Sequence, residues 1–272
     1  MTALKPLSPQ RHGSFHWRRA PDWRFAETLT TVPITAMEVQ RAMGHLPLAF
    51  MPRGDGFAFA ALLSVDNERN ALVDAKGRWQ GDHVPGYLGT YPFRIVETED
   101  GRQVVAVDED SGLVGAAIQG GEPLFQDDGQ PTPTVQRALE FLGRLAKSRM
   151  ATDRACARLA EHGLIEPWPL EVDTPKGKRN LRGLHRINNT ALDALDPETL
   201  AALRDSGALS LAYAQLLSAN GIAQLRKQAR TRTREAEQTQ RQTPTEAELF
   251  PGVDDGLQFD WDALDGGPDP QE

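Results

Sequence analysis

The chain has 272 residues, of which 39% are hydrophobic and 25% charged, and its formal net charge is −8. This composition is typical of a water-soluble folded protein and excludes a disordered chain. A membrane-spanning protein is also excluded, because no apolar run approaches the ~18 residues that a spanning helix needs. The opening "MTALKPLSPQR" lacks the apolar core of a secretory signal, so we expect a cytoplasmic protein without membrane insertion.

The charge is concentrated near the C-terminus. Residues 242–272 contain nine acidic residues and no Lys or Arg, which leaves a net charge of +1 on the other 241 residues. The preceding stretch, residues 226–241, carries a local excess of +4. Because the acidic residues of 242–272 would compete with nucleic-acid phosphates for this basic stretch, we expect no nucleic-acid binding.

The first half of the chain is typical of short strands joined by tight turns. The stretch "ITAMEVQRAMGHL" predicts one short helix before them. Apolar or alternating runs then follow from Leu48 to Asp110, interrupted by Gly-Asp, Lys-Gly and Asp-Gly pairs. We expect a mainly antiparallel sheet there, and "FRIVETEDGRQVVAVD" is its strongest hairpin signal.

The second half predicts mainly helices. A long amphipathic helix is expected to begin after a capping Thr132 and to end at Gly163. A second hairpin across Pro175-Lys176-Gly177 follows, and then a short helix capped by Asp196 and one or two further helices. The predicted class is therefore α+β, with helices of the C-terminal half packed on the N-terminal sheet. We predict one domain over residues 1–225, a basic helical extension over 226–241 and an acidic, disordered tail over 242–272.

One aromatic stretch, "GRWQGDHVPGYLGTYPF", has two interpretations. Its side chains would form an aromatic-walled pocket with polar contacts from His83 and Arg94, or they would fill the core beneath turns fixed by Gly and Pro, which the spacing alone favours. The paired carboxylates Asp127 and Asp128 would bind a cationic ligand or, as we favour, form an ordinary turn. The candidate ligand-binding residues are Trp79, His83, Tyr87, Tyr91, Arg94, Asp127 and Asp128.

Signatures of catalysis and of cofactor binding are missing from the sequence. It contains no phosphate-binding glycine loop and no G-x-S-x-G elbow. His12 and His16 stand four apart, but Gly13 and Pro9 argue against a helix, so we interpret them as surface histidines. The single cysteine, Cys156, is expected to be a buried, unreactive thiol. We therefore expect no metal and no cofactor, name no catalytic residue, and favour a non-enzymatic role.

The acidic tail is not purely polar. Large apolar residues stand among its carboxylates, and four of them, Phe250, Phe259, Trp261 and Leu264, are candidate partner-docking residues. Such segments commonly order on a partner. The alternatives are a solubilising tail and a segment that docks on the basic stretch upstream.

Several segments together resemble the SapC family of bacterial proteins, which is named for association with surface-layer protein secretion. They are "LSPQRHG", "VPITAMEVQRAMGHLPLAF", "ALVDAKGRWQGDHVPGYLGTYPFRI", "GEPLFQDDGQPTP", "LRGLHRI" and "SGALSLAYAQLLS". The resemblance itself implies no particular activity. The missing catalytic signatures and the charge-segregated C-terminus favour an accessory or adaptor protein that assists secretion or modification of another protein. The alternative is a small-ligand binder or enzyme with its site at the aromatic stretch. Gly89-Thr90 and Gln215 depart from the family pattern, so no charged or metal role is expected at those positions.

Overall fold

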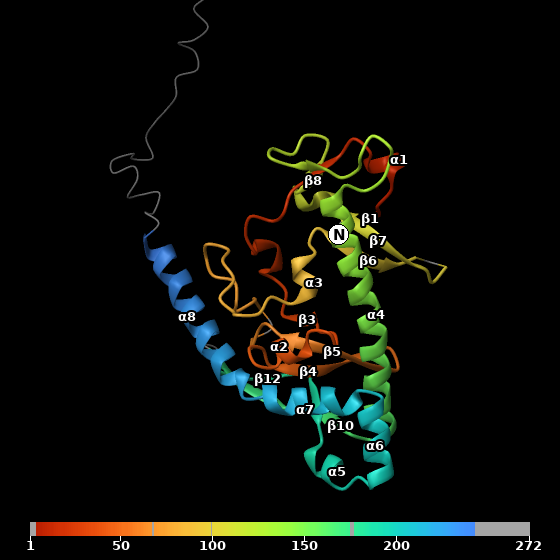
Figure 1. The fold of residues 1–272 in the computed structure, drawn as a ribbon. Coiled ribbons are helices and arrows are strands. Elements are labelled where there is room, and N and C mark those ends of the chain that lie inside the picture. Colours follow the sequence, from red (N-terminus) through yellow and green to blue (C-terminus); the bar gives the residue numbers. More distant parts are fainter. Residues whose placement is uncertain (1–3, 67, 99, 175–176, 243–272) are drawn as a thin grey trace, which may run out of the picture. The chain divides into compact units, whose positions relative to one another are not determined.

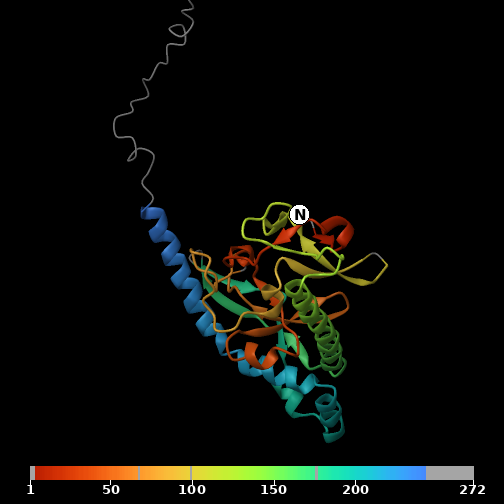
Figure 2. The same ribbon diagram turned by 45° about the horizontal axis from the view of Figure 1, so that its top comes forward.

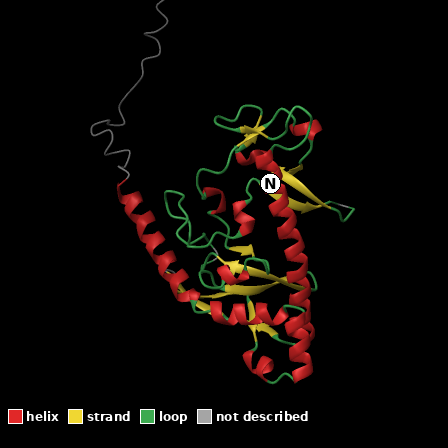
Figure 3. Cartoon of the chain, in the orientation of Figure 1, coloured by secondary structure: helices red, strands yellow, loops and turns green. Residues whose placement is uncertain are grey.

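A computed structural model describes residues 4–66, 68–98, 100–174 and 177–242 (Figure 1). These residues form helices and antiparallel strands (Figure 3), which confirms the α+β class. The chain divides into two compact units, residues 1–232 and 233–272. The elements below belong to the first unit, except that the last helix continues to Gln242. Within the described ranges, no helix has the length and apolar character needed to cross a membrane.

The largest sheet has five strands in the order β10–β13–β4–β5–β3, and its pairings are antiparallel. These strands are β3 (Thr31–Pro33), β4 (Leu48–Arg53), β5 (Gly56–Leu62), β10 (Ile165–Pro167) and β13 (His185–Ile187). β4 and β5 form a tight hairpin in which Gly54, at φ 55°, takes the left-handed conformation that favours glycine. Phe50 and Phe59 pair across it and are buried, so this hairpin lies at the centre of the main core.

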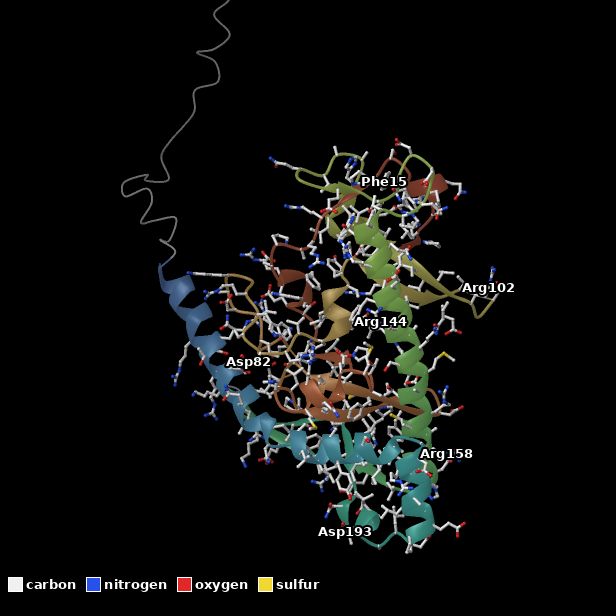
Figure 4. The ribbon with its side chains drawn as sticks, viewed as in Figure 1. Phe15, Asp82, Arg102, Arg144, Arg158 and Asp193 are labelled. Carbon is white, nitrogen blue, oxygen red and sulfur yellow. The ribbon has the colours of Figure 1, made fainter. Side chains whose placement is uncertain are left out.

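A separate sheet has the strand order β1–β7–β6. It consists of β1 (Leu4–Pro6), β6 (Phe93–Glu97) and β7 (Gln103–Asp108). The predicted hairpin is confirmed here, and Arg102 lies at its tip (Figure 4). The strands of residues 48–110 thus belong to two sheets rather than to the one expected. The reason is that residues 63–92 separate the hairpins and that β7 pairs with the N-terminal strand β1.

Two smaller sheets complete the β-structure of the described residues. One has the order β8–β2–β9, formed by β2 (His16–Trp17), β8 (Val114–Gly115) and β9 (Glu122–Pro123). The other is the hairpin of β11 (Leu170–Thr174) and β12 (Gly177–Leu181), which confirms the second predicted hairpin. Residues 175 and 176 of its predicted turn lie outside the described residues.

The long helix α4 (Pro133–Glu161) forms where the amphipathic pattern predicts it. Its C-terminal end is as expected: Gly163, at φ 65°, reverses the chain, and the Leu164 N–H donates to the carbonyl of Leu159. Thr132 precedes the helix but does not cap it with its side chain. Its hydroxyl donates instead to the Pro123 carbonyl at 3.1 Å, which ties the helix start to β9.

The other helices are short, apart from the last. They are α1 (Pro9–His12), α2 (Val39–Ala42), α3 (Gly86–Gly89), α5 (Asn189–Asp193), α6 (Pro197–Asp205), α7 (Ala208–Ser218) and α8 (Gly221–Gln242). There are also two 3₁₀ turns in the described residues: η1 (Arg24–Ala26) lies between β2 and β3, and η2 (Glu109–Ser111) lies between β7 and β8. The Asp196 carboxylate caps α6, as predicted, by accepting from the Thr199 N–H at 2.9 Å.

Helix α7 is fixed to the main sheet by buried polar side chains. The Gln215 carboxamide accepts from the Ile187 N–H of β13 at 2.9 Å and donates to the Leu48 carbonyl of β4 at 3.4 Å. Ser218 accepts from the Leu48 N–H at 3.0 Å. These bonds satisfy backbone groups where β13 and β4 share a single residue pair, His185 with Phe50. Gln215 is therefore a structural residue.

The described residues form two hydrophobic cores, and α4 contributes to both. The larger core lies on the five-stranded sheet and takes Ala155, Cys156 and Leu159 from the helix. The smaller core takes Val135 and Leu142. Figure 1 shows the helix passing from the β6–β7 hairpin to the region of α6 and α7, and the helix contacts β6, α6 and α7. The middle of α4 thus lies between the two cores.

We predict that Leu159→Ala lowers the free energy of unfolding by about 2–5 kcal/mol, because it leaves a cavity at a completely buried position. The matched control is Arg158→Ala on the next residue, an exposed arginine paired with Glu161 at 3.0 Å. We expect the control to change stability by less than about 0.5 kcal/mol. Denaturant unfolding measures both, and equal losses in the two variants would contradict this assignment of the core.

Candidate functional site

A cavity of about 440 Å³ lies beside the middle of α4. Its first wall is the face of α4 from Leu142 to Asp153, and its second is β6 from Arg94 to Glu97. Thr35, Arg53 and Tyr87 add polar groups from three other segments. In both ribbon views the helix passes close to the β6–β7 hairpin (Figures 1 and 2), and α4 and β6 are in contact. The volume lies in the range that encloses small ligands, roughly 300–1,000 Å³.

Arg94 is the central polar group of the cavity wall. One guanidinium nitrogen, Nη1, donates to the backbone carbonyls of Tyr87 and Phe93 at 3.0 and 3.1 Å. The guanidinium carbon lies 4.4 Å from the ring centre of Tyr87 and 5.0 Å from that of Tyr91, within cation–π range. Burial lowers the pKa of Arg94 from its ordinary value, because removal from water disfavours the charged form of the guanidinium.

Arg94 belongs to none of the ion pairs formed among the described residues. The other two arginines of the cavity differ in this respect: Arg53 pairs with Asp153 at 2.7 Å, and Arg149 lies 3.9 Å from the same carboxylate. Asp108 raises the pKa of Arg94 electrostatically without pairing with it. A half-buried cation that lacks a carboxylate partner faces the cavity.

Tyr91 supports Arg94 from the adjoining loop. Its ring stacks on Phe25, with centroids 4.1 Å apart and planes 8° from parallel. Its hydroxyl donates to the Asp108 carboxylate at 3.0 Å. Burial and this hydrogen bond raise the pKa of Tyr91 to about 12. Tyr91 is therefore neutral at ordinary pH, and its ring position is fixed.

A buried carboxylate, Glu38, holds the start of α3 behind the cavity. One of its oxygens accepts from the Gly86 N–H at 2.7 Å, and the other accepts from the backbone and the hydroxyl of Thr35 at 3.2 and 3.3 Å. The His83 ring lies 3.7 Å from the same carboxylate. An added Cβ at Gly86 would lie 3.2 Å from Phe141 and 3.3 Å from both Glu38 and Leu145, so these side chains would have to shift by a few tenths of an ångström. These contacts place Tyr87, the next residue, at the cavity.

The structure brings some of the predicted site residues together and not others. Tyr87 and Arg94 line the cavity, and Tyr91 packs against Arg94. Trp79 packs on the main core, with its indole N–H donating to the His83 carbonyl at 3.1 Å. His83 lies behind the cavity wall beside Glu38.

Asp127 and Asp128 do not line the cavity. They are exposed in the loop before α4. Asp128 accepts from the Gln130 N–H at 2.9 Å, and Gly129 follows it at φ 79°. This is the turn geometry that the Asp-Asp-Gly sequence favours.

Sequence reasoning missed several residues of the site. Glu38 carried a usable signal, since it is the one acidic residue in the apolar stretch "VPITAMEVQRAM". Arg149 and Asp153 carried a weaker one, the i,i+4 spacing of an ion pair on a helix. No sequence signal pointed to Arg53, because only folding brings this residue from the end of β4 to α4.

His12 and Cys156 have structural explanations. His12 is completely buried, so its interpretation as a surface histidine is wrong. A four-residue helix does form there, and His12 Nε2 lies 3.1 Å from Glu109 while its Nδ1 lies 3.2 Å from Ser8 N. Cys156 is buried as expected, and burial raises the pKa of its thiol to about 12. Within the described ranges no group of three His, Cys, Asp or Glu side chains is placed to hold a metal ion.

The fold and the cavity define an α+β protein with a small-ligand-sized cavity between two cores. The sequence model of the SapC family matches residues 7–225, so the chain belongs to the SapC family. No curated protein and no solved structure matches the chain.

We predict that tyrosine absorbance, followed against pH, contains an ionisation near pH 12 that disappears in Tyr91→Phe. Because the pKa of Tyr91 in the folded chain lies above the ordinary value of about 10, the folded state binds the hydroxyl proton more tightly than the unfolded state does. The stability it contributes is complete below about pH 10 and is lost as the pH rises toward 12. Asp108→Asn should lower the pKa of Tyr91. An unchanged high-pH ionisation in Tyr91→Phe would contradict the assignment.

Proposed function

We propose that this chain is a binding protein for a small anionic molecule, which occupies the cavity beside α4 with its negative group on Arg94. The observation that carries the proposal is the half-buried guanidinium without an ion-pair partner in the wall of a cavity. Removing a charge from water is costly unless an opposite charge compensates it. A bound anion would supply that compensation.

The residues around the cavity favour binding over catalysis. Its described lining contains no Ser, Cys, His or Lys, and its hydroxyl groups are those of Thr35, Thr90 and Tyr87. Of its two carboxylates, Asp153 is shared by two arginines, and Glu97 is exposed at the end of β6. The lining is suited to holding an anion in place and offers little to activate it.

We predict that benzoate binds the chain and that benzamide, its neutral isostere, binds about tenfold to a hundredfold more weakly. This range corresponds to the ~1.5–3 kcal/mol of a hydrogen bond to a charged group. Arg94→Gln should remove the preference for benzoate, and Arg94→Lys should keep part of it. Arg102→Gln, on the exposed hairpin tip, is the matched control and should bind benzoate as the unmodified chain does.

Ligand-observed NMR titration measures these affinities. Equal binding of benzoate and benzamide to the unmodified chain, or no binding of either at millimolar concentration, would contradict the proposal. Comparing the two probes on the unmodified chain keeps the test valid even if Arg94→Gln loses stability.

A second proposal, that the chain is a cytoplasmic accessory or adaptor protein for secretion or modification of another protein, is supported by its charge distribution. The nine acidic residues of 242–272 follow directly on the basic stretch 226–241. The described part of that stretch forms the C-terminal portion of α8. The four candidate docking residues, Phe250, Phe259, Trp261 and Leu264, lie outside the described residues.

We predict that a partner retained by the full chain from native extract is lost when the chain is truncated after Arg241. A variant with Ala at the four candidate docking positions keeps all nine carboxylates and so separates apolar docking from charge. Loss of the partner in both variants identifies the apolar residues as the contact. Retention of every partner by the truncated chain would contradict the adaptor proposal.

A further inference from the structure

We infer that the ligand of the cavity is an amphipathic monoanion, a molecule with one carboxylate-like head group on Arg94 and an apolar body of about a dozen heavy atoms along α4. This inference rests on the proposed anion-binding function and adds the number of charges, the character of the body and the size. Three features of the lining support it.

The charge of the lining sets the number of anionic groups. Arg53, Arg94 and Arg149 face the cavity together with Glu97 and Asp153, so the lining carries a net charge of +1. A monoanion neutralises this charge, whereas a dianion would leave an excess negative charge.

Exposure decides which arginine takes the head group. The side chains of Arg53 and Arg149 are 45% and 43% exposed and share the Asp153 carboxylate, so water and an ion pair already compensate them. Arg94 is more deeply placed and contacts carbonyls, a hydroxyl and two aromatic rings, while Asp108 acts on it electrostatically without forming an ion pair. Its charge has the most to gain from an anion.

The apolar part of the lining sets the character of the body. Leu142, Leu145, Ala146 and Met150 recur at helical spacing on the cavity face of α4. Ile95 and Val96 of β6 also line the cavity. Apart from Arg94, the cations of the described lining are Arg53 and Arg149, which already share Asp153, so a second anionic group on the ligand would meet either these compensated arginines or hydrocarbon.

Met150 is notable among these residues because its side chain is 53% exposed. A flexible thioether adapts its shape to an apolar ligand. Contact with the body of a bound ligand would remove this apolar surface from water.

The volume sets the size. A cavity of about 440 Å³ corresponds to about fifteen water-sized volumes of ~30 Å³. Allowing for imperfect filling, this accommodates about a dozen heavy atoms. Decanoate, a straight-chain monocarboxylate of that size, is therefore a suitable probe.

The test compares four probes on the full chain by isothermal titration calorimetry, below any micelle-forming concentration. Decanoate has the inferred chemistry, decanol lacks the charge, sebacate carries a second carboxylate on the same chain, and acetate lacks the body. We expect decanoate to bind at least about tenfold more tightly than decanol and sebacate. It should bind at least about a hundredfold more tightly than acetate, because each buried methylene adds roughly threefold to fourfold.

Two variants locate the body of the ligand. Met150→Gln makes the apolar wall polar at an exposed position, and Ala146→Phe fills part of the cavity. Both should weaken decanoate several-fold. Leu217→Gln is the control, since Leu217 is an exposed apolar residue of α7 outside this cavity and is 62% exposed.

The possible outcomes separate the inference from the proposed function. If benzoate binds but decanoate is no tighter than acetate, decanol or sebacate, the amphipathic monoanion is overturned and the anion site stands. Unchanged decanoate affinity in both cavity variants also overturns it. If neither benzoate nor decanoate binds, the proposed function itself fails.

Discussion

The participation of α4 in two cores is the constraint on which the rest of the first unit depends. The helix buries Val135 and Leu142 in the smaller core and Cys156 and Leu159 in the larger one. Because close-packed cores resist displacement of their side chains, a helix shared by both cannot shift without disturbing each. The stretch between its two buried ends packs against neither core completely, and the cavity lies there. The site is therefore a consequence of how the two sheets are joined.

The polar groups inside this framework fall into two kinds. Glu38 and Gln215 are buried, and hydrogen bonds to backbone groups of other segments account for their oxygens. These side chains accept hydrogen bonds from backbone N–H groups that secondary structure leaves unpaired, and these bonds offset the cost of their burial. Arg94 differs because it forms no ion pair among the described residues, and Asp108 acts on it only electrostatically. This contrast distinguishes a structural polar residue from a candidate functional one more clearly than residue type does.

Sequence reasoning predicted the helices and hairpins better than their arrangement. The pattern of α4, the cap at Asp196 and the hairpin of β6 and β7 depend on nearby residues and were predicted correctly. The division of the strands into two sheets was not, because it depends on pairing with the distant strand β1.

The cavity shows the same limit. Tyr87, Tyr91 and Arg94 were candidates because they are close in sequence. By contrast, Arg53 and Asp153 acquire a role only through folding, and the burial of His12 depends on Glu109, 97 positions away. Local chemistry is readable from a sequence, whereas a charge balance drawn from several segments is not.

The wide sequence separation of the cavity walls has a consequence for biosynthesis. Arg53 and Asp153 are 100 positions apart, and the bond from the Ala36 N–H to the Thr152 hydroxyl joins residues 116 positions apart. Contacts of this kind close large loops, whose entropic cost is recovered only when much of the native structure is present. A nascent chain thus has no cavity until α4 has left the ribosome and docked. A ligand of this cavity would recognise the completed fold and no partial product of translation.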